Sequence, residues 1–276
     1  MSILGGILGM LREPESGGGG GFTPDLGQYN NVYYVATTGN DSTGTGTTGN
    51  PFLTIAKALT MCADGDAIKL GVGTFAEAPA AYYLTRMSAL LVTVAVDIIG
   101  EPGETVVTST ASANPPQYSV LVSVNMPNLT DYINFYNIIF DDNGYDWYAM
   151  YGGAYLAASP VILCRAQLFN CAFISTATAR IIYTNGEYNN CFNCSFNLFA
   201  FAVHENGAAG KYAWQNCVFS GTFTHINKTT CLDNATFDSA FNVTVGTWID
   251  VGTGTDADDD TQADLGVYGG TYPWQP

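Results

Sequence analysis

Basic residues are scarce in this sequence of 276 residues, which holds 8 Lys and Arg against 24 Asp and Glu and carries a formal net charge of −16 at pH 7. A chain so acidic repels phosphate groups. This repulsion excludes binding to the phosphates of nucleic acids or of anionic membranes. Charged residues make up only 12% of the chain and hydrophobic residues 47%. Thr, Asn, Gly, Ser and Tyr take the place of charges, a composition typical of long-lived extracellular or virion β-proteins.

Long apolar runs and export signals are also missing. No segment approaches the ~18 apolar residues of a membrane-spanning helix, so we expect no membrane insertion. Residues 1–11 are apolar, but they lack the positively charged start and the small-residue cleavage site of a secretory signal.

Metal-ligand patterns are few, although the chain has 7 cysteines. Cys191 and Cys194 have the CxxC spacing of zinc and redox sites, but no second CxxC and no His pair completes a ligand set. We therefore predict no metal and no cofactor. We interpret most of the cysteines as buried, reduced and apolar in character, which favours assembly in a reducing cytoplasm.

A short phrase recurs in the second half of the chain. It covers residues 169–173, 192–196 and 215–219, with an earlier form at 136–140 and a degenerate one at 233–237. The asparagines of the three best copies, Asn170, Asn193 and Asn216, lie 23 positions apart. A period of about 20–25 residues indicates a solenoid.

The residues inside each copy alternate polar, small apolar, variable and large apolar, which is the period of a strand. Stacking in register would form one interior column of Cys171, Cys194 and Cys217, extended by Ala235, and a second of Phe140, Phe173, Phe196, Phe219 and Phe237. The asparagines would form a ladder at a bend, made of Asn170, Asn193, Asn216 and Asn234. We therefore predict a parallel β-helix; a β-sandwich with chance similarity is the alternative.

Residues 1–21 form a separate module before a domain of residues 22–276. An apolar stripe at helical spacing consists of Ile3, Leu4, Ile7, Leu8 and Leu11. Glycines weaken this helix, so it needs a partner surface, and the glycine run 17–21 would act as a tether. We interpret the module as an anchor arm.

Two segments resemble a known family. Residues 31–35 predict a strand, Gly39-Asn40-Asp41 and Asn50-Pro51-Phe52 follow, and residues 54–59 predict a short helix with Thr54 as its N-cap. Together with Gly73-Thr74-Phe75 they resemble the N-terminal capping region of pectate-lyase-like proteins, and residues 256–270 resemble the acidic turn and glycine-rich ending of many of these proteins. The resemblance implies an all-β, single-stranded right-handed parallel β-helix with a short capping helix near the N-terminus.

This fold hosts lyases, hydrolases, adhesins and phage tail spikes, so it does not settle function. An aromatic insertion offers either a sugar-stacking platform or a subunit interface, through Tyr145, Trp147, Tyr148, Tyr151 and Tyr155. Candidates for acid and base chemistry are Asp141, Asp142, Asp146, Glu187, Glu205, His204, Arg165 and Arg180. They match no catalytic motif of the family, so we predict no catalytic residue. We also interpret the acidic residues 256–264 as a turn and not as a Ca²⁺ site.

The hypothesis we favour from sequence is a structural virion protein of a phage, either a tail spike or fibre or a capsid decoration. It would assemble in the host cytoplasm, bind other virion proteins through residues 1–21 and form a homotrimer on the particle surface. Its role would be attachment to a host-surface polysaccharide or reinforcement of the shell. The alternative is a polysaccharide lyase or hydrolase, and a third hypothesis, a bacterial adhesin or surface-layer protein, would need an export signal.

Overall fold

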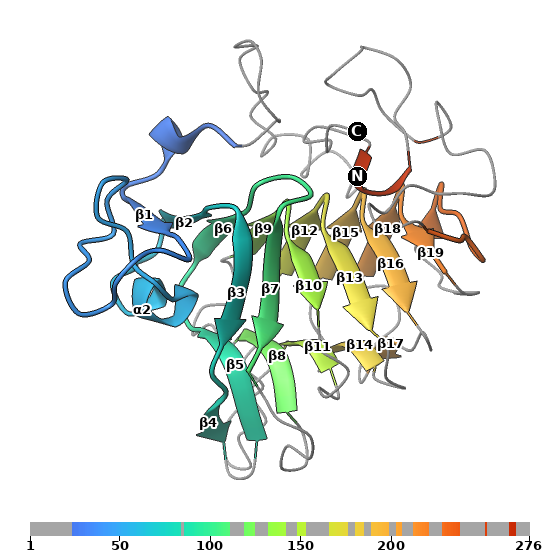
Figure 1. The fold of residues 1–276 in the computed structure, drawn as a ribbon. Coiled ribbons are helices and arrows are strands. Elements are labelled where there is room, and N and C mark those ends of the chain that lie inside the picture. Colours follow the sequence, from blue (N-terminus) through green and yellow to red (C-terminus); the bar gives the residue numbers. More distant parts are fainter. Residues whose placement is uncertain are drawn as a thin grey trace, which may run out of the picture.

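Three sheets of mostly parallel strands wind around a common interior in the computed structural model (Figure 1). The structure describes residues 24–83, 86–110, 119–124, 132–141, 148–152, 166–175, 180–184, 189–198, 203–205, 212–220, 228–237, 252 and 265–268. The anchor residues Ile3, Leu4, Ile7, Leu8 and Leu11 lie outside this part of the chain.

Each sheet is built from strands of successive coils. Sheet I contains, in spatial order, β1 (Val32–Val35), β2 (Asp66–Leu70), β6 (Val96–Ile99), β9 (Ile133–Tyr136), β12 (Ala166–Phe169), β15 (Asn189–Phe192), β18 (Tyr212–Gln215) and β20 (Lys228–Thr229). Sheet II contains β3 (Gly73–Glu77), β7 (Thr105–Ser109), β10 (Ile139–Asp141), β13 (Ala172–Ser175), β16 (Ser195–Leu198) and β19 (Val218–Phe219). Sheet III contains β4 (Ala80–Tyr83), β5 (Arg86–Val92), β8 (Ser119–Val124), β11 (Tyr148–Gly152), β14 (Arg180–Thr184) and β17 (Val203–Glu205).

A coil runs from sheet I to sheet II and then to sheet III, as β9, β10 and β11 do in turn. The same order recurs in β12, β13 and β14 and again in β15, β16 and β17, and each strand pairs with its equivalent in the next coil. β4 and β5 form the one antiparallel pair among the described strands. The predictions of a parallel β-helix and of one short helix near its N-terminus are both confirmed.

The short helix α2 (Ile55–Leu59) covers the interior at the N-terminal end of the β-helix (Figure 1). Ile55 and Ala58 are fully buried against the core. Thr54 is the N-cap as predicted, because its hydroxyl accepts the main-chain N–H of Lys57 at 3.1 Å. The Glu77 carboxylate, from β3, accepts the N–H groups of Ile55 at 2.7 Å and of Ala56 at 3.2 Å. The cap is therefore bound to the coil beneath it through otherwise unpaired helix N–H groups.

The interior contains the aromatic column that the repeat predicts. The ring centroids are 5.1 Å apart between Phe140 and Phe173, 4.8 Å between Phe173 and Phe196, and 5.0 Å between Phe196 and Phe219. Each pair is stacked, and Trp214 packs its ring edge-on against the last two. Offset stacking adds specificity to the apolar burial, so these rings fix the register of neighbouring coils.

The thiols of Cys171, Cys194 and Cys217 form the second predicted column. Each Sγ donates to a carbonyl of its own coil and to one of the preceding coil; for Cys194 these are Phe192 O at 3.3 Å and Leu168 O at 3.5 Å. Burial raises the pKa of the Cys194 and Cys217 thiols well above the ordinary value. These thiols therefore act as small apolar residues with weak donors.

The last coil corrects the sequence prediction. Cys231 continues the thiol column, because its Sγ donates to Trp214 O at 3.5 Å and to Thr229 O at 3.3 Å. Ala235 instead packs with Val218 and Leu265 in a separate cluster, and Phe237 packs against that cluster. The last coil is short, so the degenerate repeat at residues 233–237 comes after the turn that joins sheet I to sheet II in this coil.

Candidate functional site

A sharp corner joins sheet I to sheet II in successive coils. Asn137, Asn170, Asn193 and Asn216 stand there with φ between 52° and 57°, the left-handed region that asparagine tolerates better than most residues. Each donates its main-chain N–H to the residue before the next corner, as Asn193 does to Gln215 O at 3.0 Å. The corner is thus a continuous line of buried asparagines.

Asn234 does not stand on this line, although its φ is also positive, at 56°. Asn216 N donates to Thr229 O at 3.2 Å, which places Thr230 at the next corner, and Thr230 has a φ of 48°. At the other end of the line Gly100 holds the equivalent position, since its N–H donates to Tyr136 O at 2.8 Å. A Cβ at Gly100 would lie 2.3 Å from the Asn137 carbonyl oxygen, so this corner requires glycine.

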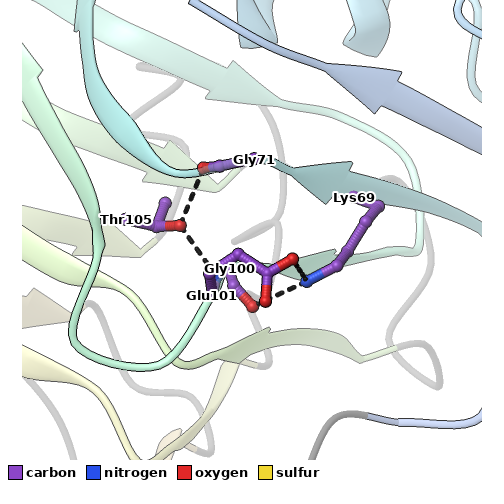
Figure 2. A network of polar contacts seen from close by, with 5 residues as sticks. All are labelled: Lys69, Gly71, Gly100, Glu101 and Thr105. Carbon is purple, nitrogen blue, oxygen red and sulfur yellow. Dashed lines mark hydrogen bonds and ion pairs between the residues drawn. The ribbon is translucent and has the colours of Figure 1, made fainter. Parts of the chain in front are cut away.

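The Gly100 corner is held by a polar network instead of an asparagine (Figure 2). Lys69 Nζ donates to Gly100 O and to Glu101 Oε1, both at 2.9 Å. The buried hydroxyl of Thr105 accepts from Glu101 N at 2.7 Å and donates to Gly71 O at 3.0 Å. Burial lowers the pKa of Lys69, and Glu101 opposes that shift. These contacts join the turn at Gly100 to Lys69 on β2 and to Gly71 after it, which makes the role of the network structural.

The outer face of sheet I carries an aromatic ladder that the sequence reading missed. The rings of Tyr136 and Phe169 stack at 4.9 Å and those of Phe169 and Phe192 at 5.1 Å. The signal was present, since these residues directly precede the corner asparagines. Leu26 and Tyr29 pack at the Tyr136 end, so part of the ladder is covered by the chain itself.

Beside this ladder lies the half-buried carboxylate of Asp97. Its Oδ2 accepts the Tyr29 hydroxyl at 2.7 Å and its Oδ1 accepts the Asn134 side-chain amide at 2.8 Å. Burial raises the pKa of Asp97, and these hydrogen bonds oppose the shift. The contacts attach the segment before β1 to the face of sheet I.

Sheet III brings together polar and aromatic residues that the sequence reading treated separately. Its register places Leu91, Ser123, Tyr151, Tyr183 and His204 in one row across five successive strands. Leu91 is 37% exposed, whereas Leu90 and Val92 on either side of it are 1% and 0% exposed. Tyr151, Tyr183 and His204 therefore occupy register positions equivalent to that of Leu91. Tyr183 was missed because loops of unequal length separate the strands, and only the pairing shows the register.

The other predicted site residues do not share this row. Tyr148 pairs with Val120 and Arg180, in the row of the buried Ser88. Glu205 pairs with Thr184 and lies in the row of the buried Val92. Tyr145, Trp147 and Tyr155 lie outside the described residues.

Of the acid and base candidates, Asp141 is half-buried and pairs with Thr108 and Ile174 on sheet II. It is therefore on a different sheet from Arg180, His204 and Glu205. Asp142, Asp146, Arg165 and Glu187 lie outside the described residues, as do the acidic residues 256–264. None of the described helices has the length and apolar character needed to cross a membrane.

Comparison with known proteins gives one family match and structural neighbours. Residues 37–143, which include α2 and the first coils, match the model of a family described as "Protein of unknown function (DUF1565)". None of the curated proteins matches the sequence.

Two solved structures are similar to this chain. A chain titled "Rhamnogalacturonan lyase" has a TM-score of 0.48 and 13% identity, over 73% of this chain and 51% of that one. This chain thus spans about half the length of that lyase. "Crystal structure of pectate lyase Pel9A" has a TM-score of 0.30 and 12% identity, over 91% of this chain and 99% of that one. The sheet topology itself establishes a parallel β-helix.

Proposed function

We propose that this protein is a structural component of a phage virion, a tail spike, fibre or capsid decoration, that contacts a host-surface polysaccharide along sheet III. The observation that carries the proposal is the row of Tyr151, Tyr183 and His204 at equivalent positions of three successive coils. Aromatic rings suit the flat apolar faces of sugars, and imidazole supplies a hydrogen-bond donor and acceptor. A row of side chains that repeats from coil to coil would contact successive sugar units of a polysaccharide.

Residues 1–21 are the anchor in this proposal, and other virion proteins are the partner. An apolar stripe followed by a glycine run would attach a rigid β-helix to a particle while allowing it to reorient. We further propose a homotrimer on the particle surface, which would multiply a weak sugar contact by avidity.

The sugar contact is tested by glycan-array binding of the full chain and of Tyr151→Ala and Tyr183→Ala. Both variants should lose binding, whereas Tyr34→Ala should retain it, because Tyr34 lies on β1 in sheet I. Equal binding by all of them would contradict the sugar contact.

The anchor is tested by deleting residues 1–21 and by light scattering after size exclusion. The deleted protein should keep its β-sheet circular dichroism and fail to enter particles. The full chain should have the mass of a trimer. Retained incorporation would contradict the anchor, and a monomeric mass would contradict the trimer.

A second candidate function is a polysaccharide lyase or hydrolase. It is favoured by the placement of Arg180 on β14 and of His204 and Glu205 on the neighbouring β17. Incubation with acidic polysaccharides, with and without Ca²⁺, should release unsaturated or reducing ends if this function holds. Release that His204→Ala abolishes would support it over the non-enzymatic proposal.

A further inference from the structure

The C-terminal segment Leu265–Val267 crosses three coils at the asparagine corner. Its last two residues begin the short 3-10 helix η2 (Gly266–Tyr268), red in Figure 1, and its contacts lie far back along the sequence. Gly266 N donates to Asn216 O at 2.7 Å, Val267 N to Ser195 Oγ at 3.2 Å, and the Asn170 side-chain amide to Val267 O at 3.0 Å. Each bond reaches a different coil, so the segment runs along the axis of the β-helix.

Apolar contacts accompany these bonds on both sides. Leu265 packs with Val218 and Ala235, and Val267, which is fully buried, packs with Ile139 and Ala172. We name the surface formed by Ile139, Asn170, Ala172, Ser195, Asn216 and Val218 the corner site. Its polar atoms form hydrogen bonds with main-chain atoms of Gly266 and Val267. Its apolar side chains contact Leu265 and Val267. This is the pattern of a site that recognises a peptide segment through both its main chain and its side chains.

The fit of the segment Leu265–Val267 to the corner site depends on Gly266. Its φ is +76°, and a Cβ there would lie 2.6 Å from Ser195 Oγ and 3.2 Å from Val218 Cγ2. A side chain at this position would therefore meet both an unfavourable backbone conformation and a close contact. The corner site selects a peptide with glycine between two apolar residues.

We propose that Leu265–Val267 is a latch, a separable segment that binds the corner site of an already formed β-helix and holds its coils together. The 27 residues between Phe237 and Leu265 give the latch a long connection, so binding is an intramolecular event at high effective concentration. The corner site would bind the same peptide sequence when it is supplied separately. This inference does not depend on the proposed sugar contact or on the virion.

The test uses the full chain carrying Gly266→Val and a synthetic peptide spanning residues 261–270. The variant should unfold at a temperature about 4–8 °C lower than the wild type. Excess peptide should restore most of that loss in the variant and leave the wild type nearly unchanged, because its corner site is occupied. A peptide with the same Gly266→Val change should restore nothing. Gly49→Val is the matched control, since no atom lies within 4 Å of a Cβ at Gly49.

Each contrary result overturns the latch. An unchanged unfolding temperature would show that Gly266 is dispensable, and a loss that the peptide does not restore would show that the segment is not separable. A variant that fails to fold would show that the β-helix does not form before the segment binds. Hydrogen exchange on the wild type adds a second measurement: the N–H groups of Gly266 and Val267 should exchange faster than those of Ala172 and Val218, and equal protection would contradict independent opening.

Discussion

The side-chain amide of Asn170 donates to the main-chain carbonyl of Val267 at 3.0 Å, across 97 positions of sequence. The same asparagine makes the turn between sheets I and II with a φ of 52° and donates its own N–H to Phe192 O. One residue thus shapes a coil, joins it to the next and binds the C-terminal segment. The corner asparagines therefore have two separable roles, one of the backbone and one of the side chain.

Substitutions at Asn193 separate these roles. Asn193→Ala should lower the free energy of unfolding by about 1–3 kcal/mol, the usual cost when a buried hydrogen-bonding group is lost. Asn193→Gly removes the same amide but adopts a φ of 52° without strain. Urea denaturation of both variants measures the two contributions. Full stability of the glycine variant would argue against a side-chain ladder, whereas equal loss in both would support it.

The Gly100 corner allows a comparison inside one network. Thr105→Val should cost about 1–3 kcal/mol, because it leaves Glu101 N and Gly71 O without their buried partner. Glu101→Gln should cost less than about 1 kcal/mol, because a partly exposed ion pair is screened by solvent. Denaturant unfolding of the two variants gives the ranking, and the reverse order would contradict the structural role of the Thr105 bridge.

The sequence predicted the parts of the fold that repeat regularly. Cys171, Cys194 and Cys217 could be aligned because they share both a spacing of 23 residues and an alternating pattern. Asn234 was misplaced because the phrase around it looks like a repeat, while hydrogen bonds assign the corner to Thr230. The row of Tyr151, Tyr183 and His204 could not be predicted from the sequence, because strand pairing decides which residues become neighbours on sheet III.

The dependence of the unfolding free energy on pH should include a contribution from the half-buried Asp97. Burial raises its pKa in the folded state above the ordinary 3.8, so the folded protein binds this proton more tightly than the unfolded chain does. Stability from this group is therefore greatest below pH 3.8 and falls as the pH rises through the raised folded pKa. Asp97→Asn should flatten the curve of unfolding free energy against pH, measured by denaturant titration from pH 4 to 8.

Tyr29→Phe is the opposing variant for the same curve. It removes a hydrogen bond that lowers the pKa of Asp97, so the folded pKa should rise further and the curve should become steeper. Shifts of the two variants in the same direction would contradict the assignment to Asp97.

Thiol reactivity should follow the order in which the coils open. Burial raises the pKa of the Cys194 and Cys217 thiols, and it raises the pKa of Cys62 to about 12, so little reactive thiolate is available in the native state. We expect these cysteines to resist a disulfide reagent at pH 8 and to react fully in guanidinium chloride. Cys231 should react first as denaturant is added, because it is only partly buried and lies on the short last coil. Mass spectrometry of the labelled peptides gives the order, and labelling of Cys194 before Cys231 would show that the β-helix opens from its centre and not from its C-terminal end.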